Sequence, residues 1–257
     1  MSFFKCTAST LLLCTIAATT AYAQQPKTTV KVVLDDNAKI QVSFAKQPRV
    51  SQSVFTALQQ LDTSTLDIHW QSSGLYDVSS PLALKQETLM RLANEEDFAP
   101  MSQKNHWHKL RQTIREMRFG HKITTPIDPD ATRINAAVNP LISGQWVLNL
   151  RTHADSVLVL GNVKNEGEQP WRQRQDAKTY ADSAGLLTNS LSKLTVIQPS
   201  GQVETHKIAY WNRDFHEVAP GAIVYVSMPH AHTWFDVDKP NVSTNQVVVE
   251  LLRNRLP

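Results

Sequence analysis

The spacing of apolar and polar residues changes twice along the chain, and each change marks a different kind of element. Between residues 28 and 50, apolar and polar residues alternate in two short runs that are separated by a polar turn at residues 35–37. Alternation with a period of two is typical of strands that bury one face. This segment therefore predicts a β-hairpin.

Helical spacing replaces this alternation between residues 51 and 119. Two sets of apolar residues recur here three, four or seven positions apart: Leu82, Leu89 and Leu92, then Trp107, Leu110, Ile114 and Met117. Each set predicts the apolar face of one helix, and two helices joined near residues 94–100 would form an antiparallel hairpin. Gly120 follows the last apolar residue, where a glycine ends many helices.

From residue 122 onward, short apolar runs bounded by turn residues return. They predict strands at residues 145–150 and 157–160, a helix at 176–187, a hairpin at 194–210 and a strand at 222–226. The run at 157–160 is apolar on both faces, as an internal strand of a sheet is. The order β-β-α-β-β indicates a small mixed unit, neither Rossmann-like nor all-β.

The last stretch, residues 243–255, fits two structures. Val247 and Val249 favour a strand, because β-branched residues are common in strands. The spacing of Val248, Leu251 and Leu252 suits an amphipathic helix instead. The residues alone leave both structures open.

The N-terminal residues indicate an exported protein. Lys5, an apolar stretch at residues 11–18 and the Ala-x-Ala motif at 21–23 are typical of a cleaved signal peptide, so residues 1–23 are excluded from the fold. Both cysteines lie in this segment. The exported protein would therefore have no thiol, no disulfide and no cysteine ligand for a metal.

Composition and motifs exclude several classes of function. The 26 basic and 23 acidic residues give a formal net charge of +3, which is too even for a protein that binds nucleic acid through bulk charge. No apolar run reaches the roughly 18 residues of a membrane-spanning helix. Phosphate-binding glycine loops and a serine nucleophile elbow are missing from the sequence. We therefore expect no cofactor.

Several short motifs together resemble the capsule-biosynthesis GfcC family. They are the glycine-bounded run at 159–167, Asp-Pro-Asp at 128–130, Asn-Pro-Leu at 139–141, Gly-Gln-Trp at 144–146, Ala-Tyr-Trp-Asn-Arg at 209–213, the run at 220–226 and Arg-Leu-Pro at 255–257. The resemblance covers nearly all of the chain after the signal peptide. It is strongest from residue 127 to the end.

The resemblance implies an α+β fold with two β-grasp domains, the first interrupted by a helical hairpin, and a C-terminal amphipathic helix. The first domain would cover residues 24–152 with the hairpin at 52–119, the second 153–234, and the helix 235–257. Both domains would be similar to those of Wza-type outer-membrane polysaccharide exporters. The resemblance therefore favours the helix for the C-terminal stretch.

The same resemblance implies a function. Members of the family are encoded with capsule or exopolysaccharide secretion genes, which implies a periplasmic, non-enzymatic accessory protein of polysaccharide biosynthesis and export. We expect a monomer that contacts export proteins of the outer membrane, an acidic polysaccharide, or both. The alternative from another class is a periplasmic polysaccharide-modifying enzyme, a lyase or a hydrolase. A third hypothesis is a structural partner whose hairpin contacts an exporter without binding glycan.

Three residues are the predicted ligand-binding residues. In the family pattern, an arginine that lines a pocket follows a glycine after the hairpin, and here the pair is Gly120-His121. Arginine holds a carboxylate bidentately at any pH, whereas histidine is largely neutral at pH 7, which puts affinity for an acidic sugar in doubt. Arg118 and Arg133 are the other two. Arg133 also fits a structural pairing with the aspartates of the preceding turn.

A basic stripe runs along the predicted helix at His108, Arg111, Arg115 and Arg118. It fits an electrostatic face for an anionic partner, although a solvated helix surface explains it more simply. Three tryptophans, Trp146, Trp171 and Trp211, fit sugar-stacking platforms, but at strand ends we interpret them as core anchors.

Histidines and carboxylates raise two further possibilities. His106 and His108 point about 200° apart on a helix, so they cannot share a metal ion. His230 and His232 lack a third ligand at a telling distance. We therefore predict no metal site. The carboxylates near residues 128 and 166 lie in turns, and we interpret them as turn residues rather than as a glycosidase pair.

Overall fold

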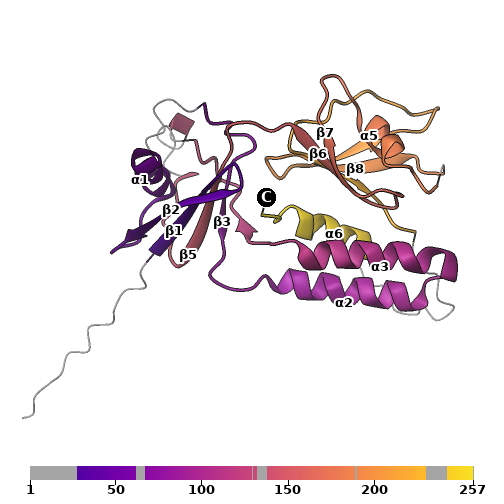
Figure 1. Ribbon diagram of the computed structural model, residues 1–257, viewed down its shortest axis with the longest axis horizontal. Coiled ribbons are helices and arrows are strands. Elements are labelled where there is room, and N and C mark those ends of the chain that lie inside the picture. Colours follow the sequence, from indigo (N-terminus) through magenta and orange to yellow (C-terminus); the bar gives the residue numbers. More distant parts are fainter. Residues whose placement is uncertain are drawn as a thin grey trace, which may run out of the picture.

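The computed structural model of the protein describes residues 28–61, 67–128, 130–131, 138–188, 190–229 and 242–256. Within these ranges the chain forms two five-stranded sheets with helices packed beside them (Figure 1). The predicted α+β class is therefore confirmed. The β-grasp assignment and the domain boundaries stay predictions, and the predicted signal peptide lies outside the described ranges.

The first sheet contains the predicted N-terminal hairpin. Its strands, in spatial order, are β2 (Asn37–Phe44), β1 (Thr28–Leu34), β5 (Gln145–Leu150), β3 (Gly74–Asp77) and β4 (His121–Lys122). The turn between β1 and β2 places Asp35 and Asp36 at φ angles of 46° and 64°, the backbone shape of a tight hairpin turn. Helix α1 (Val50–Leu61) buries Val54 and Ala57 in the core of this sheet.

The zone that the spacing predicts to be helical, residues 51–119, also contains a strand. β3 lies within it and pairs antiparallel with β5 and β4. Leu75 and Tyr76 are adjacent and both buried, so this four-residue strand has no alternation that reveals it in the sequence. The two helices of the hairpin accordingly begin at Ala83 rather than near residue 52. Helix α1 packs on the first sheet instead.

The inner strands of the second sheet are buried on both faces. Its strands, in spatial order, are β7 (Gly167–Pro170), β6 (Ser156–Gly161), β10 (Ile223–Val226), β8 (Lys193–Ile197) and β9 (Val203–Lys207). Val157 and Val159 of β6 join the cluster around helix α5 (Ala177–Ser183), and Leu158 and Leu160 face the opposite side. The prediction of an internal strand, apolar on both faces, is confirmed.

Three helices cover the second face of this sheet. They are α2 (Ala83–Phe98), α3 (Met101–Glu116) and α6 (Thr244–Leu252), of which α2 and α3 form the predicted hairpin (Figure 1). The hairpin is inserted between β3 and β4 of the first sheet. Its buried Leu92, Trp107 and Leu110 nevertheless pack in one cluster with Leu160 and Tyr225 of the second sheet. The hairpin therefore fastens the two sheets to each other.

The ambiguous C-terminal stretch is a helix. Ser243 and Gln246 form a capping box at its start, with the Gln246 side chain accepting from the Ser243 N–H at 2.8 Å. The Asn245 side chain accepts from the Tyr225 hydroxyl at 2.7 Å and from the Met228 N–H at 2.9 Å. The capping box at its N-terminus and its contacts with the second sheet thus stabilise this stretch as a helix rather than as a strand.

Candidate functional site

A cleft opens where the two sheets meet the residues that follow α6. Its volume is about 270 Å³, and it is lined by the β1–β2 turn, β3, β4, the link between the sheets, the β8–β9 turn and the residues after α6. Besides Tyr76, the cleft is lined by basic and by acidic side chains. The basic ones are Lys122, Arg151, His153, Arg253 and Arg255, and the acidic ones are Asp35, Asp36, Asp155 and Glu168. Segments far apart in the sequence thus meet at one mixed-charge site.

Lys122 is a half-buried cation of this cleft. β4 pairs it with Tyr76 of β3, and its ammonium lies 5.9 Å from the centre of the Tyr76 ring and donates to the Pro199 carbonyl. Burial, together with the positive charge of Arg253, lowers the pKa of Lys122 to about 8. Within the described part of the chain, no carboxylate forms an ion pair with this ammonium.

The segment after α6 fixes the position of Lys122. The Asn254 side chain accepts a hydrogen bond from the Lys122 backbone N–H at 3.0 Å, and the Asn254 carbonyl accepts from the Gly120 N–H at 3.1 Å. Arg253 and Arg255 flank Asn254, and both line the cleft. The segment after α6 therefore contributes two cations to the cleft and also positions Lys122.

The two arginines differ from Lys122 because carboxylates partly neutralise them. Arg253 pairs with Glu250 at 2.7 Å and donates to the Gly201 carbonyl at 2.9 Å. Arg255 lies 3.5 Å from a Glu168 oxygen. Lys122 therefore differs from both arginines in forming no ion pair with a carboxylate of the described residues.

Tyr76 adds a neutral donor. Its side chain is buried, and burial raises its pKa to about 12 although the charges of Arg255 and Arg151 act in the opposite direction. The hydroxyl therefore keeps its proton throughout the physiological range. The ammonium of Lys122 is a suitable donor for a carboxylate or phosphate oxygen, and Tyr76 lines the cleft beside it as a neutral side chain.

Asp35 and Asp36 of the β1–β2 turn also line the cleft, and both have hydrogen-bond or ion-pair partners. Asp36 pairs with Arg151 at 2.8 Å, and Asp35 accepts from the Thr152 N–H at 3.0 Å and from its hydroxyl at 2.8 Å. Burial would raise the pKa of Asp35, but the hydrogen bonds from Thr152 and nearby positive charges outweigh it and lower the pKa. Asp35 therefore stays ionised and is unsuited to donate a proton.

Two of the three predicted ligand-binding residues, His121 and Arg118, are described, and neither lines the cleft. The His121 side chain is exposed, because alternate residues of a strand point to opposite faces and the neighbouring Lys122 points into the cleft. The Arg118 side chain is exposed as well, while its carbonyl accepts from the Leu256 N–H at 2.9 Å. Arg133 lies outside the described residues. Ligand-binding roles for these three residues stay predictions.

The basic stripe of α3 is partly neutralised within the hairpin. His108 and Arg111 both contact the Glu96 carboxylate of α2, at 2.8 and 2.7 Å. Burial would raise the pKa of Glu96, but these hydrogen bonds outweigh it and lower the pKa. His108 and Arg111 of the stripe therefore hold α2 to α3, and Arg115 and Arg118 are exposed.

The three tryptophans separate into different roles. Trp171 packs against the α5 cluster and donates its indole N–H to the Val218 carbonyl at 2.8 Å, which confirms it as a core anchor. Trp146 is half-buried and packs against the first core. The same prediction is wrong for Trp211, which is exposed, because residues 209–212 form a turn beyond β9 rather than a strand end.

Two further findings concern the described ranges only. Within them, no group of three histidine, cysteine, aspartate or glutamate side chains is arranged to hold a metal ion. In the same ranges, no helix combines the length and the apolar character that crossing a bilayer requires. His230 and His232 lie outside these ranges.

The chain resembles known proteins along most of its length. It matches the family described as capsule biosynthesis GfcC, N-terminal, over residues 26–153, and the one described as capsule biosynthesis GfcC C-terminal over residues 165–257. It is also similar to the uncharacterized protein YjbG of Escherichia coli (strain K12). That identity is 26% over 184 residues, which cover 70% of this chain and 74% of the relative.

Proposed function

This chain belongs to the capsule biosynthesis GfcC family, and from that membership we propose that it is a periplasmic, non-enzymatic accessory protein of capsule or exopolysaccharide biosynthesis and export. Its task would be recognition of an acidic polysaccharide. The observation that carries this proposal is a cleft in which the ammonium of Lys122 forms no ion pair with any carboxylate of the described residues, and which the neutral side chain of Tyr76 also lines.

Physical chemistry favours an anion in this cleft. Taking an ammonium partly out of water is costly where none of the described carboxylates pairs with it, and the lowered pKa of Lys122 reflects that cost. A carboxylate or phosphate group that entered the cleft would relieve it, because opposite charges attract more strongly where water is excluded. Carboxylate groups are what distinguish acidic polysaccharides from neutral ones, so Lys122 provides the matching contact.

The enzyme alternative needs a carboxyl group that holds a proton near neutral pH. Burial raises the pKa of Glu166, against the effect of hydrogen bonds from Gly161 and Thr113. Both oxygens of Glu166 are engaged, however, one by the Gly161 N–H and the other by the Thr113 hydroxyl, each at 3.0 Å. This residue connects α3 to β6, and its geometry favours a structural role over catalysis.

A titration with defined oligosaccharides tests the proposal. We expect the protein to bind a galacturonate hexamer at least about tenfold more tightly than the fully methyl-esterified hexamer, because esterification removes the charge but keeps the chain. Affinity for the acid should fall as salt is added. Neither hexamer should be shortened during long incubation, as chromatography would reveal. Equal affinities, or cleavage of either hexamer, would contradict the proposal.

The hairpin tip is a candidate contact for an export protein. Phe98 and Met101 stand at the junction of α2 and α3, and their exposed fractions are 66% and 84%. A photo-crosslinking residue at position 101 is expected to capture the outer-membrane polysaccharide exporter of the same cell. Position 90, also an exposed methionine but in the middle of α2, is the matched control. Equal capture from both positions, or none, would remove the tip from consideration.

A further inference from the structure

A second surface gathers aromatic side chains away from the cleft. The segment between β9 and β10 at residues 208–217, here called the aromatic loop, exposes 99% of Tyr210, 79% of Trp211 and 58% of Phe215. Single exposed apolar residues are common on protein surfaces. Three aromatic residues within six positions of one loop form a concentrated patch, and such patches mark binding sites.

The backbone presents two of these rings together. The Asn212 N–H donates to the Ala209 carbonyl at 3.0 Å, which closes a turn with Tyr210 and Trp211 at its two corners. The Asn212 side chain accepts from the Ala209 N–H, also at 3.0 Å, and so locks the same turn. Ala209 itself is buried. The two rings are therefore held at the apex of a fixed turn.

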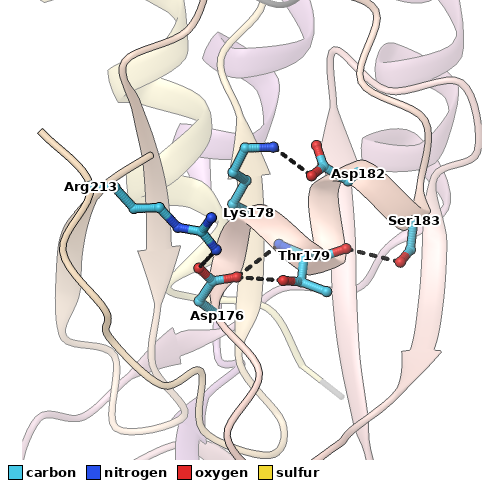
Figure 2. A network of polar contacts seen from close by, with 6 residues as sticks. All are labelled: Asp176, Lys178, Thr179, Asp182, Ser183 and Arg213. Atoms are coloured by element: carbon cyan, nitrogen blue, oxygen red, sulfur yellow. Dashed lines mark hydrogen bonds and ion pairs between the residues drawn. The ribbon is translucent and has the colours of Figure 1, made fainter. Parts of the chain in front are cut away.

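An ionic network fastens the loop to α5 (Figure 2). Arg213 pairs with Asp176 at 2.7 Å, and the other Asp176 oxygen accepts from the Thr179 N–H at 3.0 Å and from the Thr179 hydroxyl at 2.6 Å. Asp176 is buried, and its carboxylate caps the N-terminus of α5. At the last residue of the loop, the Glu217 carboxylate accepts a hydrogen bond from the Arg174 N–H at 2.6 Å. These contacts hold the loop in place from within the protein.

The chemistry of the loop favours a sugar chain over a protein partner. Three aromatic side chains bury about 150–250 Å² each, which is less in total than the roughly 800 Å² per partner of a stable protein interface. Polar side chains such as Asp214 and His216 are interleaved with the rings and exposed. A pyranose ring offers a flat C–H face for an aromatic ring and hydroxyl groups for such polar neighbours.

We propose that the aromatic loop is a saccharide-stacking site, which holds the uncharged faces of a polysaccharide by means of Trp211 and Tyr210. The choice of a polysaccharide as the ligand rests on the proposed function above. The stacking site is separate from the cleft, because the β8–β9 turn lines the cleft and the loop begins at the other end of β9. Five residues of strand span about 16 Å.

The test uses the methyl-esterified hexamer, which is neutral, and an NMR titration of ¹⁵N-labelled protein. Amide signals of residues 209–216 should shift at millimolar hexamer. Trp211→Ala should weaken this binding about tenfold or more, the usual effect of truncating an aromatic anchor. Trp211→Phe, which keeps a ring, should stay within about threefold of the native protein. Phe55→Ala, at an exposed aromatic residue of α1, is the control and should change nothing.

Each other outcome overturns one proposal or the other. If the acidic hexamer shifts signals of the cleft while the loop signals stay unchanged, the stacking site is wrong and the proposed function stands. If the neutral hexamer shifts the loop but the acidic one is not preferred, the proposed function fails and the stacking site stands. Equal affinity of Trp211→Ala and the native protein for the neutral hexamer would also refute stacking. So would loop signals that shift with the protein concentration and not with the hexamer, because the loop would then bind a second copy of the protein. Unchanged melting temperatures would exclude misfolding of these variants.

Discussion

Replacing Lys122 with methionine is expected to lower the affinity for the galacturonate hexamer about thirtyfold or more, as the loss of one partner in a buried charge contact usually does. Methionine keeps the length and the apolar stem of lysine but has no charge. The arginines at positions 253 and 255 cannot replace the lost ammonium, since Glu250 and Glu168 engage them. Isothermal titration with both hexamers measures the change.

The pH dependence of this site has a defined sign. The pKa of Lys122 is lowered to about 8 in the folded protein, whereas an unfolded lysine titrates near 10.4. Between these values the unfolded chain binds the extra proton, so the free energy of unfolding rises with pH. Affinity for the acidic hexamer should fall over the same range, because the ammonium is lost. Opposite slopes of stability and binding are the signature of this one group.

Lys31→Met is the control for both measurements, because Lys31 is exposed on β1 and lies outside the cleft lining. It should bind the acidic hexamer like the native protein and keep the rise in stability above about pH 8. Lys122→Met should lose both features. Retention of either feature in Lys122→Met would show that another group carries the charge, and the assignment of the cleft to Lys122 would then be abandoned.

The elements of this fold could be predicted from the sequence wherever local pattern and tertiary environment agree. β6 shows this, because Val157 to Leu160 are apolar on both faces and both faces are covered. β3 shows the opposite case. Its buried pair Leu75 and Tyr76 has no periodicity, and only its pairing with β5 and β4 makes it a strand.

The candidate site could not be predicted in the same way. Lys122 is in the cleft and His121 is outside it because of a register that a two-residue strand does not reveal in its sequence. Arg253 and Arg255 reach the cleft only because α6 docks beside the second sheet. Trp211 was expected in the core because the sequence places it at the end of a predicted strand. These differences concern tertiary placement rather than residue type, and the ligand-binding role of His121 stays a prediction.

Leu92→Ala should reduce the free energy of unfolding by about 2–5 kcal/mol, the usual cost of a cavity at a buried leucine. Leu92 of α2 is fully buried, in the cluster that joins the hairpin to Leu160 of β6 and Leu251 of α6. The loss is therefore expected in the contact that fastens the two sheets. Chemical denaturation followed by circular dichroism measures it.

Met90→Ala is the matched control, because Met90 lies two positions away on the same helix and is 63% exposed. It should change the stability by no more than about 0.5 kcal/mol. If both variants lose the same amount, the apolar face of the hairpin is not held on the second sheet in solution. That face would then be free for a partner, and the tip would no longer be the preferred contact for an exporter. A large difference between the variants would instead establish that the hairpin joins the two sheets, which leaves Phe98 and Met101 as its exposed apolar residues at the tip.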